Sequence, residues 1–204
     1  MSAGCAIVAA ARGDRPGFVI FKPLTTFIIL LGAAWLVQPG GHPYRDLVVL
    51  GLALSLAGDF LLTLPADRLL AGLVAVLLAH LAYLAAFDQG SPLAARQLPW
   101  LAPWILAAGA AAWYAWGGLG RRRVPVLCYG AVVCAMGWRA AMRGAVPAIG
   151  RDSFRLALLG AGLFVASDAI LVIRRFRRPF RAAHEVELAA YWAAQLLIAL
   201  SVRT

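Results

Sequence analysis

The sequence has few charged residues for its length. Of 204 residues, 14% are charged and 63% are hydrophobic, and the mean hydropathy is +0.81. Soluble domains have roughly 25% charged and 45–50% apolar residues, so this chain has too few polar side chains to cover a water-soluble fold. The composition excludes an ordinary soluble domain and predicts a single membrane domain over residues 1–204.

Cysteine and lysine are also scarce. Cys5, Cys128 and Cys134 form no metal-binding or redox motif, and no HExxH-type spacing is present, so we expect no metal and no cofactor. The net charge of +10 comes from basic residues between long apolar runs, all but one of them arginine. That placement fits the anionic head groups of a membrane and argues against nucleic acid as a partner.

Seven stretches are long and apolar enough to cross a bilayer, which takes roughly 20 residues. Short connections between them favour antiparallel neighbours. An eighth apolar stretch, Ser2–Ala11, is too short to span and is interpreted as an interfacial segment or part of a truncated helix. The sequence thus predicts an all-α polytopic transmembrane bundle of about eight helices, the first one short. The seven stretches are Phe18–Val37, Asp46–Leu64, Leu69–Phe87, Leu98–Trp116, Val124–Met142, Phe154–Ile173 and Val186–Val202.

The basic residues are divided unevenly between the two ends of these stretches. Seven of the 19 lie at one end, and the other twelve lie at the opposite end. The positive-inside rule therefore places the twelve in the cytosol and both chain ends outside. An arginine-rich, alanine-rich chain with one lysine is typical of bacterial genes of high GC content, so we expect a multi-pass protein of a bacterial inner (plasma) membrane. The seven are Arg45, Arg96, Arg139, Arg143, Arg151, Arg155 and Arg203.

Two aspartates lie well inside apolar runs. Asp59 and Asp168 each lie five residues from the predicted cytosolic end of their stretch, about 7–8 Å at 1.5 Å per residue. Lys22 lies four residues inside its own stretch from the same end. Because a carboxylate near a helix centre costs roughly 2.5–3.5 kcal/mol on insertion scales, this common depth predicts one polar cluster towards the cytosolic leaflet. A structural ion pair that locks helices together is the alternative.

Other polar side chains share helix faces with these charges. Ser55 lies one turn before Asp59, and Tyr191 and Gln195 repeat at four-residue spacing. For His80, a structural bridge between helices is an alternative to a role in a site. The expected substrate-binding residues are Lys22, Ser55, His80, Tyr83, Tyr191 and Gln195.

Two close carboxylates in a low dielectric do not both ionise, which leaves a protonated acid beside a carboxylate base. Such a pair can protonate an ether-type leaving group and activate water through an oxocarbenium-like state. The depth is that at which a phospholipid has its glycerol linkages, and the arginines of residues 174–181 are candidates to bind its phosphate.

Five short motifs, taken in order along nearly the whole chain, resemble the YhhN family of membrane proteins, which includes the lysoplasmalogenases. The resemblance implies an eight-helix bundle that hydrolyses the vinyl ether bond of lysoplasmalogens to a fatty aldehyde and a glycerophospho-alcohol. It also implies that Asp59 and Asp168 are the essential acidic pair. The N-terminus departs from the family, which has a full first helix. The matching stretches are Phe21–Thr25, Ser55–Asp59, His80–Tyr83, Gly160–Asp168 and Tyr191–Ile198.

Two other classes of function remain open. A small proton-coupled transporter would use Asp59 and Asp168 as proton relays. A non-catalytic lipid-binding protein would use them only for structure. The sequence leaves the oligomeric state, the head-group preference and the division of roles between the two aspartates undetermined.

Overall fold

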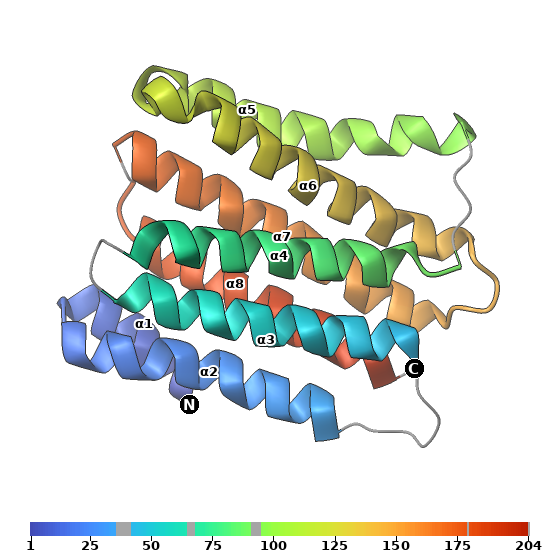
Figure 1. The fold of residues 1–204 in the computed structure, drawn as a ribbon, viewed down its shortest axis with the longest axis horizontal. Coiled ribbons are helices and arrows are strands. Elements are labelled where there is room, and N and C mark those ends of the chain that lie inside the picture. The colour runs from blue at the N-terminus through green and yellow to red at the C-terminus, as the bar shows by residue number, and fades with distance from the viewer. Residues whose placement is uncertain (36–41, 65–67, 91–94, 179, 204) are drawn as a thin grey trace.

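The computed structural model describes residues 1–35, 42–64, 68–90, 95–178 and 180–203. In these residues, eight α-helices lie side by side along a common direction (Figure 1), which confirms the all-α bundle. Short 3-10 segments join or extend some of them. The helices are α1 (Ser2–Arg12), α2 (Arg15–Trp35), α3 (Pro43–Thr63), α4 (Leu69–Asp88), α5 (Ala102–Leu119), α6 (Arg123–Met142), α7 (Arg151–Phe176) and α8 (Ala183–Leu200).

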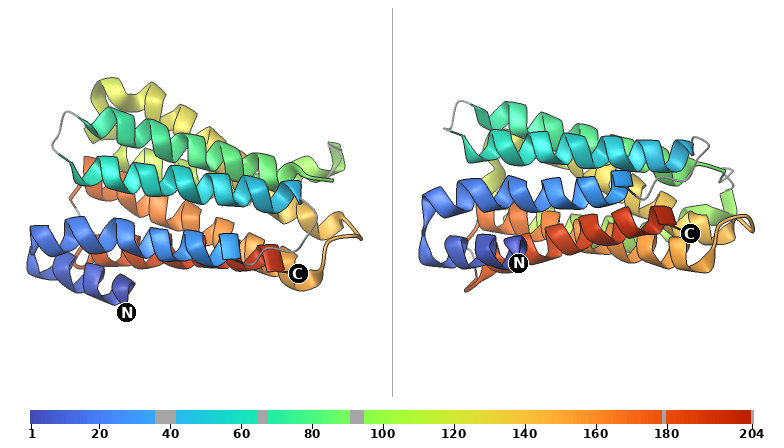
Figure 2. Two further views of the ribbon diagram at one scale, coloured as in Figure 1. Left: turned by 60° about the horizontal axis from the view of Figure 1, so that its bottom comes forward. Right: turned by 90° about the horizontal axis from the view of Figure 1, so that it is seen from below.

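Six helical stretches of the described chain are long and apolar enough to cross a membrane. One of them, Gln97–Ala145, contains both α5 and α6, which reverse direction at Gly120, where φ is 50° (Figure 1). The helices α2 to α8 therefore form a multi-pass integral membrane protein. The shorter α1 packs against α2 and α8 (Figure 2).

The predicted spans agree with the helices to within a few residues. The helix α2 begins at Arg15, three residues before the predicted start, and the predicted end at Val37 lies outside the described residues. The helix α7 runs on to Phe176, beyond the predicted end at Ile173. As a result, Asp59 lies four residues from the end of its helix and Asp168 lies eight from the end of its own.

Small residues allow the helices to approach closely, as is usual in membrane bundles. A Cβ atom at Gly160 of α7 would lie 2.7 Å from Ile198 Cγ1 of α8, and one at Gly58 of α3 would lie 2.6 Å from Val76 Cγ2 of α4. Large apolar side chains such as Leu106 and Trp113 remain exposed on the outside of the bundle, where lipid would cover them.

The helices α4, α5 and α6 are not neighbours in the order in which they follow one another in the chain. The pairs α3–α4 and α7–α8 pack together, as short connections predict. The helix α4, however, packs against α6, and α5 packs on the far side against α6 and α7 (Figure 1). This arrangement brings residues of α4, α6 and α7 together in the interior.

Candidate active site

The carboxylate of Asp59 lies in the interior between α2 and α3. Its side chain is 2% exposed, and Lys22 Nζ lies 3.3 Å from Oδ1. Thr26 Oγ1 donates a hydrogen bond of 2.6 Å to Oδ2. The structure thus places Lys22 against Asp59, and it adds Thr26, which the sequence did not single out. A cation and a hydrogen-bond donor both favour the ionised form of this carboxylate.

Buried hydroxyl groups surround this ion pair. The Tyr191 hydroxyl faces Asp59 and Ser55, and the Tyr83 hydroxyl lies beside Ser55. Within the described residues, these three hydroxyls and the side-chain amide of Gln195 complete no hydrogen bond of good geometry, although the hydroxyls lie close to one another and to Asp59. Because buried polar atoms are normally paired, these groups are suited to bind a polar substrate or a water. We call Asp59 and these neighbours the Asp59 group.

The carboxylate of Asp168 has different partners. His80 Nε2 of α4 lies 3.2 Å from Asp168 Oδ2, and the Tyr129 hydroxyl of α6 donates a hydrogen bond of 3.1 Å to the same oxygen. The His80 side chain is fully buried, and that of Asp168 is 13% exposed. Asp168, His80 and Tyr129 form the Asp168 group. Sequence reasoning missed Tyr129, whose only signal was a hydroxyl inside an apolar run.

One hydrogen bond of His80 shows that its Nδ1 atom carries hydrogen. His80 Nδ1 is 2.8 Å from the carbonyl oxygen of Val76, and a carbonyl can only accept, so Nδ1 carries hydrogen. Nε2 lies 3.2 Å from Asp168 Oδ2 but has no hydrogen-bond partner among the described residues. The His80–Asp168 pair is therefore suited to share a proton, on either the ring or the carboxyl group.

Phe164 of α7 connects the two groups. Its ring packs edge-on against His80 at 4.7 Å and against Tyr191 at 5.4 Å between centroids, and it also contacts Tyr83. In the part of the chain that the structure describes, no hydrogen bond or ion pair joins Asp59 directly to Asp168. The one polar cluster expected from the sequence is thus two adjacent polar groups that share an aromatic contact.

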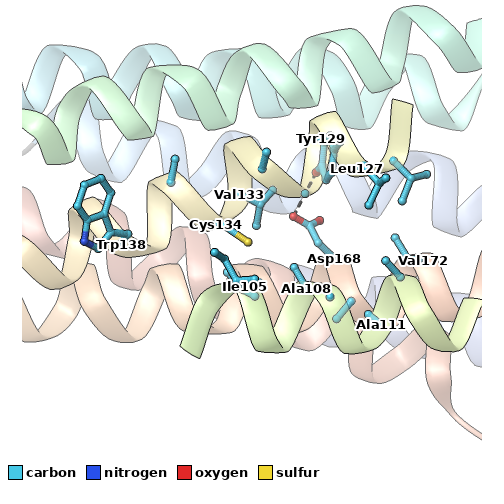
Figure 3. A pocket seen from close by; sticks show the side chains of 18 of the residues that line it. Ile105, Ala108, Ala111, Leu127, Tyr129, Val133, Cys134, Trp138, Asp168 and Val172 are labelled. Carbon is cyan, nitrogen blue, oxygen red and sulfur yellow. Dashed lines mark hydrogen bonds between the residues drawn. The ribbon is translucent and has the colours of Figure 1, made fainter. Parts of the chain in front are cut away.

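An apolar groove lies next to the Asp168 group. It has a volume of about 400 Å³ and is lined by α5, α6 and α7 (Figure 3). Cavities that bind small molecules measure about 300–1,000 Å³. Asp168 is the one charged residue among those that line this groove, and nearly all of the others are apolar. The groove therefore presents an acidic group to a ligand that is otherwise apolar.

Glu187, one turn before Tyr191 on α8, forms an ion pair with an arginine of α7. Glu187 accepts two hydrogen bonds from Arg174, of 2.6 Å from Nε and 3.2 Å from Nη2. This bidentate pair joins the end of α7 to the start of α8. Tyr191 and Gln195 lie further along the same face of α8 and are buried.

The fold and these two groups define a multi-pass membrane protein with a buried histidine–aspartate pair beside an apolar groove. A profile of the YhhN family matches residues 17–202, and the chain belongs to that family. No solved structure matches it.

Named relatives come from bacteria and mammals. The chain is 32% identical to the membrane protein YhhN of Escherichia coli O6:H1, over 99% of this chain and 95% of that protein. It is 36% identical to the lysoplasmalogenase TMEM86B of Homo sapiens, over 85% and 70% of the two chains. It is also 32% identical to the lysoplasmalogenase TMEM86A of Bos taurus, over 87% and 72%.

Proposed function

We propose that this protein is a membrane-embedded hydrolase of lysoplasmalogen-like ether lysophospholipids. It cleaves the vinyl ether bond and releases a fatty aldehyde and a glycerophospho-alcohol. One observation is central to the proposal: His80 Nε2 lies 3.2 Å from Asp168 Oδ2, and Asp168 lines an apolar groove. The relatives named lysoplasmalogenase support the choice of substrate.

The first step needs an acid. A proton from the His80–Asp168 pair adds to the vinyl carbon that is not bonded to oxygen, and the carbon next to oxygen becomes part of an oxocarbenium ion. The Tyr129 hydroxyl donates to Asp168 Oδ2 and stabilises the negative charge that grows there as the proton leaves. Positioned acid–base groups of this kind contribute about 10²–10⁴-fold to a rate.

The second step needs a base and a water. Asp59, whose two carboxylate oxygens contact Lys22 and Thr26, acts as the base and takes a proton from water as the water oxygen bonds to the oxocarbenium carbon. The product is a hemiacetal, which breaks its bond to the glycerol oxygen to give the aldehyde and the alcohol. The buried hydroxyls near Asp59 would orient the water. For both aspartates to act on one bond, the reacting carbons must lie near Phe164, which contacts both groups.

We further propose a bacterial inner membrane and a site open to the cytosolic leaflet. The twelve basic residues at one end of the bundle support this orientation. Asp59 lies four residues from the same end of α3, at a depth suited to the glycerol region of a lipid.

The test is aldehyde release by the purified protein from a vinyl-ether lysophospholipid, with the ester-linked and saturated ether lipids as comparisons. We expect release from the vinyl ether alone, and a loss of at least about 100-fold in kcat for Asp168→Asn and for Asp59→Asn. Asp152→Asn is the control, since Asp152 is 75% exposed at the start of α7, and should match the wild type.

Wild-type rates in both aspartate variants would contradict the acid–base mechanism. If the folded protein releases no aldehyde but moves protons together with a solute across liposomes, it is a transporter. If it binds the lipid and does neither, it is a lipid-binding protein.

A further inference from the structure

The apolar groove between α5, α6 and α7 ends at a group of arginines. On each helix, the last groove residue lies two to five residues from an arginine or from a ring that an arginine covers. On α6, Arg123 precedes the groove residue Val126, and on α7, Arg177 follows Val172. On α5, Tyr114 follows Ala112.

These arginines are held in place by aromatic rings and one carbonyl. The Arg123 guanidinium lies 4.6 Å from the centroid of Trp116, and that of Arg122 lies 6.0 Å from Phe176. Arg177 lies over the Tyr114 ring at 5.4 Å, and its Nε donates a 2.7 Å hydrogen bond to the Tyr114 carbonyl. In the described residues no carboxylate pairs with Arg122, Arg123 or Arg177. Their charges are therefore available to an anion.

The groove itself has room for a chain because small residues line it. A Cβ atom at Gly109 of α5 or at Gly130 of α6 would meet no other atom within 4 Å. The lining residues extend along α6 from Val126 to Trp138, about 18 Å at 1.5 Å per residue. An extended hydrocarbon chain can lie along that length.

Asp168 lies between the two ends of the groove but closer to the arginines. Figure 3 shows its carboxylate nearer to Leu127 and Val172 than to Trp138. Arg177 directly follows the last residue of α7, so it lies about 13 Å from Asp168 at the helical rise. A glycerophosphate and a long arginine side chain together can span that distance. A bound lipid would thus have its phosphate at the arginines, its ether linkage at Asp168 and its chain towards Trp138.

We propose that this groove is the hydrocarbon-chain subsite of the lysophospholipid substrate, and that Arg122, Arg123 and Arg177 form its phosphate subsite. The lipid enters between α5, α6 and α7 from the leaflet that faces the arginines. The inference rests on the proposed hydrolase function, which it extends from the reacting bond to the rest of the lipid.

The first experiment is photo-crosslinking, because it needs no turnover. The probe is a saturated 1-O-alkyl lysophospholipid with a diazirine at the end of its chain, in bilayer nanodiscs. We expect labelled peptides from α5 and α6 near Ile105 and Trp138. Gly130→Leu and Gly109→Leu should reduce this labelling at least fivefold, while Gly32→Leu, at an open and exposed position of α2, should not change it.

The second experiment measures turnover of vinyl-ether substrates of two chain lengths. Gly130→Leu should raise KM for a long chain about tenfold and for a short chain much less. The triple variant Arg122→Gln, Arg123→Gln, Arg177→Gln should raise KM about tenfold with little change in kcat. The matched control removes three other exposed arginines of the same membrane face, away from residues 174–181: Arg12→Gln, Arg15→Gln, Arg68→Gln.

The outcomes separate the subsite from the hydrolase proposal. Groove labelling without aldehyde release by the wild type would overturn the hydrolase proposal and keep the lipid site. Turnover with labelling on α2 or α8, and with normal KM in Gly130→Leu, would overturn the chain subsite. An equal rise of KM in both triple variants would overturn the phosphate subsite, since it would show only a general effect of surface charge.

Discussion

At the scale of single residues, the ion pair of Lys22 and Asp59 is a buried contact whose loss should lower stability. Their side chains are 14% and 2% exposed, so neither charge is well hydrated when the other is removed. We predict that Lys22→Met lowers the free energy of unfolding by about 3–5 kcal/mol, because it leaves a buried carboxylate without its cation. Denaturation in detergent, followed by circular dichroism, measures this.

The double variant Lys22→Met, Asp59→Leu is the control for that prediction. Removal of both charges leaves no unpaired ion, so its stability should return close to that of the wild type. Equal stability of Lys22→Met and the wild type would mean that water reaches Asp59 and replaces Lys22. It would also contradict the assignment of Asp59 as a base held in position by Lys22.

Tyr129 makes one hydrogen bond whose loss should be visible in the kinetics. Tyr129→Phe removes the donor to Asp168 Oδ2 and keeps the ring beside His80. A hydrogen bond to a charged group contributes about 1.5–3 kcal/mol, so we predict a fall of about 10–100-fold in kcat/KM with little change in stability. Tyr44→Phe, which loses a hydrogen bond to Ser201 far from the groove, should keep wild-type kcat/KM.

The contrast between Asp168 and Tyr129 shows what single residues reveal in a sequence. Asp168 stood out because a charge in an apolar run is expensive wherever the helix packs. A tyrosine in such a run costs little free energy of insertion, so it does not stand out. Its role depends on which helices lie next to it. The contact of Lys22 with Asp59 was expected from their common depth, while the separate partners of Asp168 were not.

At the scale of helices, the close packing of α7 and α8 depends on Gly160. A Cβ atom there would lie 2.7 Å from Ile198 Cγ1 and 3.0 Å from the Ala194 carbonyl oxygen. We predict that Gly160→Ala destabilises the protein by about 1–3 kcal/mol, because the extra carbon forces the two helices apart. Thermal unfolding in detergent is the measurement.

Gly162, two residues after Gly160 on α7, is the matched control. A Cβ atom at Gly162 meets nothing within 4 Å, and alanine has the higher helix propensity by about 1 kcal/mol. Gly162→Ala should therefore be neutral or stabilising. If both alanine variants lose stability equally, the close approach at Gly160 is not what holds α7 to α8.

Helix positions were predictable from the sequence, but one important neighbour relation was not. Length and hydropathy define a spanning helix locally, and the predicted bounds were close to those of α2 to α8. Whether α4 packs against α5 or α6 depends on side chains far apart in the chain. That choice brings His80 and Tyr129 to Asp168 and opens the groove between α5, α6 and α7, so neither the groove nor the Asp168 group could be derived from local patterns.

At the scale of the whole molecule, the orientation decides which leaflet supplies the lipid. The arginines at the end of the groove are on the side with twelve of the 19 basic residues. The positive-inside rule places that side in the cytosol. The chain end after α8 lies at the opposite side of the bundle (Figure 1), so the C-terminus should be outside.

Reporter fusions test this orientation. In a bacterial host, alkaline phosphatase fused after Thr204 should be active, and green fluorescent protein at the same place should be dark. A fusion after Arg122, between α5 and α6, should give the reverse pattern. Glutamine at Arg121, Arg122 and Arg123 removes three of the twelve charges and should shift both reporters towards a mixed orientation, because the difference between the sides becomes small. The opposite result in both fusions of the unaltered chain would place the arginines and the groove entrance in the outer leaflet, and the substrate would then have to come from there.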